Sequence, residues 1–140
     1  MDEEIATAHD RIKIVSLTVI AGTMGPQSAT LSLDIEGKQL TTQSTGNGPV
    51  DAIFNAIHAL VPHEAKLELY QVHAVTEGTD AQAEVSVRLS ESGRAVTARG
   101  ADPDTLVASA KAYLGALNKL MSRRHKSSGI ERRIHSTDVG

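Results

Sequence analysis

Cysteine is absent from this chain of 140 residues. Its absence excludes disulfide bonds, thiolate metal sites and a cysteine nucleophile, and it fits a reducing compartment. Tryptophan is absent as well, and the aromatic side chains are limited to one phenylalanine and two tyrosines. The core must therefore be built from Val, Ile, Leu and Ala, and the chain offers no stacking platform for single-stranded nucleic acid.

The chain also lacks any apolar run that approaches the roughly 20 residues needed to span a bilayer. Its first residues, Met1 to Glu4, are acidic where a secretory signal would be basic. A length of 140 residues suits one domain with a modest core. These features predict a soluble, cytoplasmic protein that does not contact a membrane.

Charge is unevenly spread along the chain. Residues 1–121 carry 9 Lys and Arg against 15 Asp and Glu. The remainder, 122–140, is a basic tail with only Glu131 and Asp138 opposing its Lys and Arg side chains. A basic tail is typical of proteins that bind nucleic acid or an acidic partner. Because the rest of the chain is acidic, we expect a solvated end and no nucleic-acid partner.

In the first half of the chain, the hydrophobic period switches from two residues, typical of strands, to about 3.6, typical of helices. It predicts strands at 11–21, 28–35 and 38–43, with a turn at Gly37. A helix is expected from Pro49 until Pro62 stops it. The alternation slips between Ile14 and Val15, which predicts a β-bulge.

The second half repeats this order, with strands expected at 67–74, 81–90 and 94–99 and a helix that ends near Met121. Asp102 is the expected N-cap of that helix, with Pro103 after it. The glycine-to-proline helix entry at 46–49 thus recurs at 100–103, and we expect these two segments to be counterparts.

The pattern predicts an α+β fold made of two pseudo-symmetric βββα units, residues 11–62 and 63–121. Together they would form one domain, 11–121, between an N-terminal extension, 1–10, and the basic C-terminal tail, 122–140. Because one helix covers only part of the apolar face of a three-stranded sheet, the units should pack on each other.

The first helix entry is the most informative segment of the sequence. It consists of Gly46, Asn47, Gly48, Pro49, Val50 and Asp51. The first N–H groups of a helix lack internal partners and carry the positive end of the helix dipole, so a carboxylate or phosphate can bind there. Gly46 and Gly48 would let the backbone adopt left-handed conformations and approach a small ligand closely. The alternative interpretation is a helix cap with no ligand.

Several motifs resemble the C-terminal regulatory domain of 2-isopropylmalate synthase in their residues, order and approximate spacing. They are Gly-Asn-Gly-Pro-Val-Asp-Ala at 46–52, Leu-Tyr at 69–70 with His-Ala at 73–74, Gly-Thr-Asp-Ala-Gln-Ala at 78–83, Val-Ala-Ser-Ala-Lys-Ala-Tyr at 107–113 and Ala-Leu-Asn-Lys-Leu at 116–120. The resemblance runs from about Ile12 to Leu120. The related domain of citramalate synthase, with isoleucine as effector, is the alternative, although 80–83 and 112–113 look more like the leucine-pathway enzyme.

The resemblance implies that the full enzyme condenses acetyl-CoA with 2-oxoisovalerate on a separate barrel, and that leucine inhibits it through this domain. The barrel binds a divalent metal with a His-x-His pair, and no such pair occurs in this sequence. We therefore expect no catalysis, metal or cofactor on this chain alone.

Leucine is a zwitterion with a branched side chain, so its site needs anion donors, a cation acceptor and an apolar slot. The helix entry would bind the carboxylate, and Asp51 or Asp80 would face the ammonium group. Val50, Ala81 and Ala83 would shape the slot. Tyr70 matches a tyrosine of the family's pocket. The structural alternatives are a dipole-stabilising role for Asp51 and a core-packing role for Tyr70, and His73 is expected to be structural.

The family's inhibitor lies where two such domains meet, which implies a homodimer that also contacts the catalytic barrel of the same enzyme. Two other classes of function stay open. One is a stand-alone amino-acid sensor that docks on another protein, and the other is a dimerisation domain without a ligand.

Overall fold

The fold is described by a computed structural model for residues 11–21, 25–73 and 82–121. In chain order its elements are β1 (Ile12–Ile20), β2 (Gln27–Ile35), β3 (Lys38–Gly46), α2 (Pro49–Leu60), β4 (Lys66–His73), β5 (Ala83–Glu91) and β6 (Arg94–Asp102), followed by a helix at 105–121. Strand, strand, strand and helix thus occur twice, which confirms the predicted α+β fold of two βββα units. Within these ranges, no helix is long and apolar enough to cross a membrane.

Two antiparallel sheets are formed, with strand orders β1-β2-β3 and β4-β5-β6. The register shifts between Ile14 and Ser16 in β1, which confirms the predicted bulge. A second shift lies between Leu67 and Leu69 in β4, where the sequence pattern did not reveal one. Both bulges lie in the first strand of a unit, at the edge of its sheet, where bulges are most common.

The β2–β3 and β5–β6 hairpins turn through two residues with positive φ in each case. These are Glu36 and Gly37 in the first unit, and Ser92 and Gly93 in the second. Two successive positive φ values are typical of the type I′ turn, whose twist matches that of the flanking strands. The turn predicted at Gly37 is therefore confirmed, and both units have the same hairpin geometry.

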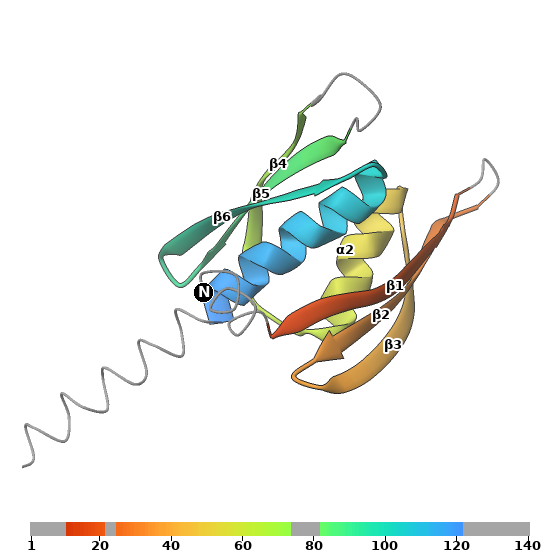
Figure 1. Cartoon of the computed structure of the whole chain (residues 1–140), viewed down its shortest axis with the longest axis horizontal. Helices are drawn as coiled ribbons and strands as arrows, with labels where there is room; N and C mark the ends of the chain where they lie inside the picture. Colours follow the sequence, from red (N-terminus) through yellow and green to blue (C-terminus); the bar gives the residue numbers. More distant parts are fainter. Residues whose placement is uncertain (1–10, 22–24, 74–81, 122–140) are drawn as a thin grey trace, which may run out of the picture.

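Both helices lie between the two sheets, as Figure 1 shows. The apolar side of α2 packs mainly on β3 and β2. Small residues keep the helices close to the strands, and those that are fully buried in the two helices are Ala52, Ala56, Ala108, Ala110, Ala112 and Ala116. The core is continuous across the two units, since buried residues of both sheets and both helices belong to one cluster. The units therefore pack on each other as predicted.

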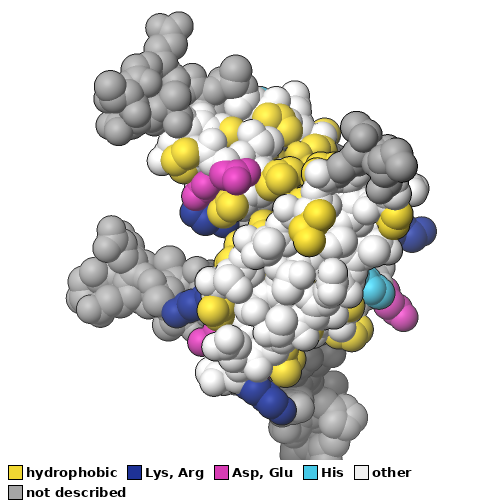
Figure 2. All heavy atoms as spheres, turned by 90° about the vertical axis from the view of Figure 1, so that its right-hand side faces the viewer, with side chains coloured by type: hydrophobic (Ala, Val, Ile, Leu, Met, Phe, Trp, Pro, Cys, Tyr) yellow, Lys and Arg dark blue, Asp and Glu magenta, His cyan; other side chains and the backbone are white. Residues whose placement is uncertain are grey.

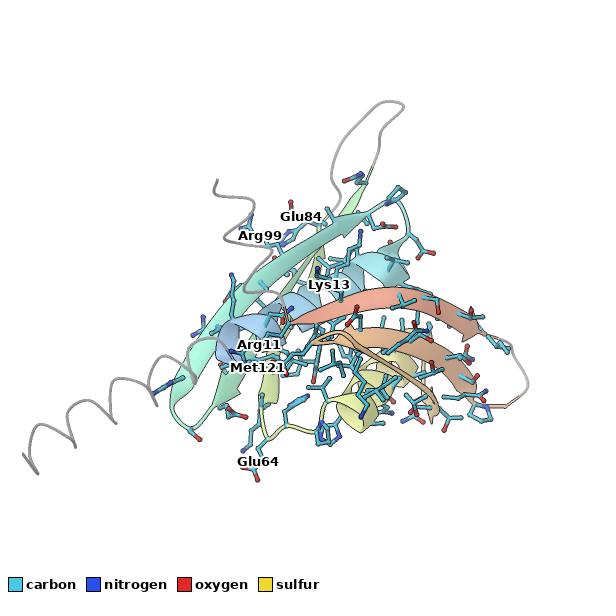
Figure 3. The ribbon with its side chains drawn as sticks, turned by 60° about the horizontal axis from the view of Figure 1, so that its bottom comes forward. Arg11, Lys13, Glu64, Glu84, Arg99 and Met121 are labelled. Carbon is cyan, nitrogen blue, oxygen red and sulfur yellow. The ribbon has the colours of Figure 1, made fainter. Side chains whose placement is uncertain are left out.

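Asn118, in the second helix, ties the first strand of the chain to the second unit. Its Oδ1 accepts hydrogen bonds from the backbone N–H groups of Arg11 and Ile12, each at 3.0 Å, and its Nδ2 donates to the Ile12 carbonyl at 3.1 Å. Figure 3 shows Arg11 beside Met121, at the end of the same helix. Buried backbone groups at this sheet edge thus find a side-chain partner in place of a neighbouring strand.

The two units align in a way that differs from the predicted correspondence. When β2 is aligned with β5 from end to end, β3 coincides with β6, and the start of α2 coincides with that of the second helix. In this alignment Gly46 corresponds to Asp102 instead of Gly100, and Gly48 corresponds to Asp104. The two glycine-to-proline segments are therefore not counterparts, and the helix entries of the two units differ in sequence.

Candidate functional site

The first helix begins without a side-chain cap. Gly48 is the N-cap residue, with φ −157° and ψ 171°, and Pro49 occupies the first turn. Asp51 instead turns back, and its Oδ2 accepts a hydrogen bond from the N–H of Asn47 at 3.0 Å. The carboxylate of Asp51 therefore braces the loop before the helix. The first-turn N–H groups of Val50 and Asp51 remain the local donors for an anion.

The two glycines of this entry do not have the conformational role that the sequence predicted for them. Neither Gly46 nor Gly48 has a positive φ, so the expectation of left-handed conformations is wrong. A Cβ on Gly46 would lie 2.5 Å from the backbone nitrogen of Ala52, whereas a Cβ on Gly48 would meet nothing within 4 Å. Gly46 is thus needed because β3 approaches α2 closely, while the space beside Gly48 is open.

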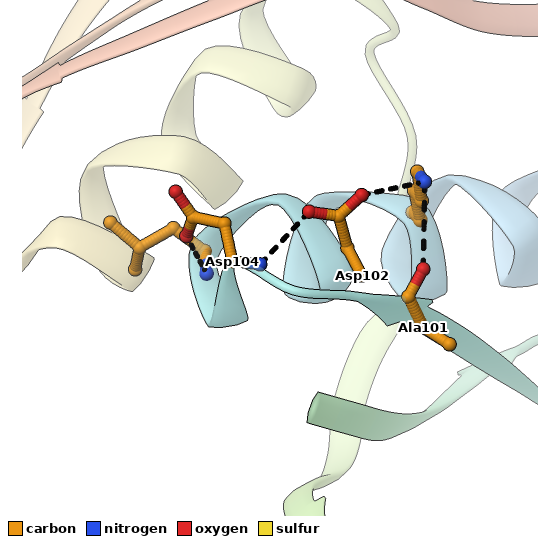
Figure 4. A network of polar contacts seen from close by, with 5 residues as sticks. Ala101, Asp102 and Asp104 are labelled. Atoms are coloured by element: carbon orange, nitrogen blue, oxygen red, sulfur yellow. Dashed lines mark hydrogen bonds and ion pairs between the residues drawn. The ribbon is translucent and has the colours of Figure 1, made fainter. Parts of the chain in front are cut away.

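The second helix begins in another way, and the predicted N-cap is wrong by two residues. Asp104 Oδ1 accepts the N–H of Leu106 at 2.8 Å, and the N–H of Ala108 donates to the carbonyl of Asp104 at 2.9 Å, so Asp104 is the N-cap. Asp102 Oδ2 accepts the N–H of Asp104 at 2.9 Å, as Figure 4 shows. Pro103 therefore precedes the cap instead of following it.

Asp102 also pairs with Lys111, whose Nζ lies 3.0 Å from its Oδ1. The hydrogen bond from the Asp104 N–H and then the contacts of Lys111 lower the pKa of the Asp102 carboxyl below its ordinary value. Carboxylates thus occupy the start of the second helix, and negative charge already stabilises its dipole. Of the two helix entries, the first is the one that combines open space with an uncapped first turn.

All three aromatic side chains of the protein meet in one cluster between the units. Phe54 on α2 lies edge-on to Tyr70 on β4, with ring centroids 5.7 Å apart, and it lies 4.4 Å from the ring of Tyr113 on the second helix. Phe54 is four residues beyond Val50, so the two lie on the same side of α2. The cluster therefore connects the first helix entry with β4 and the second helix.

Hydrogen bonds hold both tyrosines of this cluster. The hydroxyl of Tyr70 lies 2.8 Å from the Oγ of Ser109, and the hydroxyl of Tyr113 lies 3.1 Å from the Nε2 of His63. Burial raises the pKa of the Tyr113 hydroxyl to about 12. Tyr113 is almost fully buried, whereas Tyr70 is only partly buried. Of the two rings, Tyr70 is the one that a ligand at the surface can reach.

Apolar side chains on the inner face of β4 extend from the aromatic cluster to the protein surface. Leu67 and Val72 pair with the buried residues Leu89 and Val85, so they point toward the helices, yet 45% and 46% of their surfaces are exposed. One helix per sheet leaves the edge strand uncovered. Figure 2 shows hydrophobic side chains gathered where the two units meet. This uncovered strip is a candidate surface for a partner.

Other predicted site residues are placed as follows. Ala83 is the first residue of β5 and pairs with Asp102, near the start of the second helix. His73, at the end of β4, has its Nε2 3.3 Å from the Oγ of Ser86, which fits a structural role. Asp80 and Ala81 lie outside the described residues. Figure 1 shows both helices beginning at the same end of the molecule, which brings the first entry and the end of β6 to one region.

Sequence reasoning missed Ser109 and His63 as partners of the tyrosines. Ser109 is completely buried in the second helix, where a serine interrupts a run of alanines. A polar side chain within an apolar helical stripe is a signal that it has a specific partner, but the partner's identity depends on how the units pack.

A groove with a cavity volume of about 320 Å³ lies elsewhere, between β1 and the second helix. Ile12, Ile14 and Leu114 line it, with Lys13 and Lys111. Its one buried polar side chain, Asn118, already bonds to β1 with both its oxygen and its nitrogen. Of the hydrogen-bonding capacity of Asn118, only the second proton of Nδ2 is left for a ligand, so the groove is a weaker candidate than the first helix entry.

Comparison with known families decides what kind of domain this is. The profile of the LeuA allosteric (dimerisation) domain matches residues 1–121. The chain belongs to this family. Over 122 residues it is 78% identical to the 2-isopropylmalate synthase of Methylobacterium nodulans, covering 87% of the chain and 24% of that protein. It is 71% identical over 128 residues to the 2-isopropylmalate synthase of Bradyrhizobium diazoefficiens, covering 91% of the chain and 25% of that protein.

The 2-isopropylmalate synthase of Methylorubrum populi is 73% identical over 120 residues, which are 86% of the chain and 23% of that protein. The chain thus spans about a quarter of the length of these relatives. The resemblance to the regulatory domain of this enzyme, inferred from the motifs at 46–52 and 107–113, is confirmed.

Proposed function

We propose that this LeuA-type domain binds L-leucine and passes feedback inhibition to the catalytic barrel of a 2-isopropylmalate synthase, which acts on acetyl-CoA and 2-oxoisovalerate in the cytoplasm. The main support is the uncapped start of α2 beside the cluster that contains all three aromatic side chains. N–H donors for a carboxylate and an apolar surface for a branched side chain are thus adjacent, as an amino-acid effector requires.

In this proposal the leucine carboxylate accepts hydrogen bonds from the first-turn N–H groups of α2. The open space at Gly48 admits it, because no atom lies within 4 Å of where a side chain would begin. The ring of Tyr70, together with Val50 and Ala83, contacts the isobutyl group. Asp51 binds the N–H of Asn47 with one carboxylate oxygen, and its other oxygen is a proposed contact of leucine. Asp80 and Ala81 are proposed contacts of leucine as well.

The domain also acts as a homodimer in this proposal. The exposed apolar residues Leu67 and Val72 on β4 provide a surface that a second copy would cover. A symmetric pair is the commonest form of a soluble oligomer, and it would place two effector sites at or near one interface. Leucine would then be coupled to the distant active site by a free energy of about 1–3 kcal/mol, typical of allosteric enzymes.

Calorimetric titration of the chain with leucine, isoleucine and valine tests the effector. We expect leucine to bind, and millimolar leucine to raise the melting temperature, since a ligand that prefers the native state stabilises it. Tighter binding of isoleucine would instead favour the regulatory domain of a citramalate synthase. Absence of any binding would leave a dimerisation domain without an effector.

The regulatory role needs a longer protein. In a 2-isopropylmalate synthase that carries this domain, leucine should lower the rate of 2-isopropylmalate formation. The double variant Gly48→Asp and Tyr70→Phe should relieve that inhibition while leaving the rate without leucine unchanged. Unaltered inhibition would contradict the placement of the effector at this entry.

A further inference from the structure

A buried hydroxyl pair joins β4 to the second helix. Ser109 is completely buried, and its Oγ lies 2.8 Å from the hydroxyl of Tyr70 and 2.8 Å from the carbonyl oxygen of Thr105. Two oxygen atoms at this distance repel each other unless a proton lies between them, and only the serine can supply one to a carbonyl. Ser109 therefore donates to Thr105, and it accepts the proton of Tyr70.

This direction leaves the Tyr70 hydroxyl as an acceptor only. A tyrosine hydroxyl has one proton and lone pairs that accept. Because its proton is committed to Ser109, its remaining hydrogen-bonding capacity suits a donor such as an ammonium group. A carboxylate would meet only lone pairs there. The chemistry of the pair thus distinguishes the two charged ends of an amino acid.

The fold does not require this polar pair, because the corresponding positions of the first unit hold apolar residues. Tyr70 pairs with Val87 of β5, whose counterpart in β2 is Leu31, and Leu31 pairs with Leu17. In the same alignment of the units, Ser109 corresponds to Ile53 of α2. The counterparts of Tyr70 and Ser109 are therefore apolar, and an isoleucine fills the buried helix position without a hydrogen bond.

We propose that Ser109 is a positioning residue that orients the effector: it holds Tyr70 with its oxygen available as an acceptor for the ammonium group of a bound amino acid. The carboxylate of the amino acid then lies at the start of α2. This inference rests on the proposed function, and it adds the orientation of the effector and the residue that determines it.

The test compares leucine with 4-methylpentanoate, which has the same carbon skeleton and carboxylate but no amino group. Calorimetry on the 140-residue chain measures the ratio of the two dissociation constants. In the wild type we expect leucine to bind more tightly. In Ser109→Ala the Tyr70 proton is free to turn toward the ligand, and we expect the preference for leucine to fall about tenfold, the usual effect of losing one hydrogen bond to a charged group.

Tyr70→Phe is the second variant, because it preserves the bond between Ser109 and Thr105 and removes only the hydroxyl. It should reduce the preference for leucine to a similar extent, and it decides the question if Ser109→Ala does not fold. Tyr113→Phe is the matched control, since it removes a hydroxyl from the same cluster that bonds to His63 instead. Its preference should equal that of the wild type.

A wild-type preference in folded variants of both Ser109 and Tyr70 would overturn the role of Ser109. A melting temperature that falls while the preference stays constant would have the same meaning, because the pair would then be only structural. Failure of the wild-type chain to bind leucine at all would instead overturn the proposed function. The two failures are therefore distinguishable.

Discussion

Gly48→Asp separates binding from folding at the first helix entry. Gly48 is the N-cap of α2, its backbone is extended, and a Cβ there would meet nothing within 4 Å. Aspartate therefore fits without a clash, and it is itself a favourable N-cap residue that exceeds glycine by only a few tenths of a kcal/mol. The like charge of Asp51 offsets part of that gain. We expect the free energy of unfolding to change by less than about 0.5 kcal/mol.

Binding should respond much more strongly than folding. The new carboxylate would occupy the first-turn N–H donors to which the leucine carboxylate binds in the proposed site. It would also repel that carboxylate. At a separation of about 4 Å and an effective dielectric constant near 20, two like charges differ from a neutral pair by about 4 kcal/mol, which is roughly a thousandfold in affinity.

Calorimetry with leucine, paired with chemical denaturation, checks both expectations on the same samples. Gly48→Ala adds a Cβ but no charge and no acceptor, so it measures the steric part of the loss, and its affinity for leucine should fall much less than that of Gly48→Asp. Gly48→Asn occupies the same donors without charge, and it should give an intermediate loss. A folded Gly48→Asp protein with wild-type affinity would refute the placement of the carboxylate at this helix start.

Four further predictions concern the fold and the dimer. Gly46→Ala should destabilise the chain by about 1–3 kcal/mol, because its Cβ would lie 2.5 Å from a backbone nitrogen of α2; urea denaturation measures this. Asn118→Ala should cost about 3 kcal/mol and speed hydrogen exchange at the start of β1, because two N–H groups and a carbonyl lose their partner. Burial raises the pKa of Tyr113 to about 12 from 10.0, so the neutral form is favoured in the native state. The free energy of unfolding that this group contributes is fully present below pH 10 and is lost as the pH rises toward 12, by at most about 2 kcal/mol. Denaturation curves recorded between pH 10 and pH 12 measure this loss. Val72→Asp should convert the proposed dimer into a monomer by light scattering at micromolar concentration, because it would bury a charge in an apolar interface.

Three of these predictions have a matched control. Gly48→Ala should cost less than Gly46→Ala, at most about 1 kcal/mol, because alanine is a poorer N-cap residue than glycine but its Cβ would meet nothing. Equal effects would contradict the close approach of β3 to α2. Tyr113→Phe should remove the loss of stability above pH 10, so a persistent loss would assign it to other groups. Lys66→Asp, at a solvent-exposed position of the same strand, should leave the dimer intact. A monomeric wild type would remove the basis of the dimer prediction.

Much of the fold follows from local sequence patterns. The alternation of apolar and polar residues depends on backbone geometry alone, so six strands and two helices could be predicted to within a few residues. The hairpin turns at Gly37 and Gly93 and the bulge after Ile14 also depend on a few neighbouring residues. The motifs at 46–52 and 107–113 pointed to the family because residue types and their order can be read directly from the sequence.

Tertiary structure alone decided which residues meet. Asn118 bonds to Arg11, 107 residues away, and Tyr70 bonds to Ser109, 39 residues away. It also decided that Gly46 has no room for a side chain beside α2, and that Asp104, rather than Asp102, caps the second helix. Periodicity shows which face of an element is apolar, but the partner of a buried polar group depends on how the two units are placed against each other, and that placement follows from packing between residues far apart in the chain.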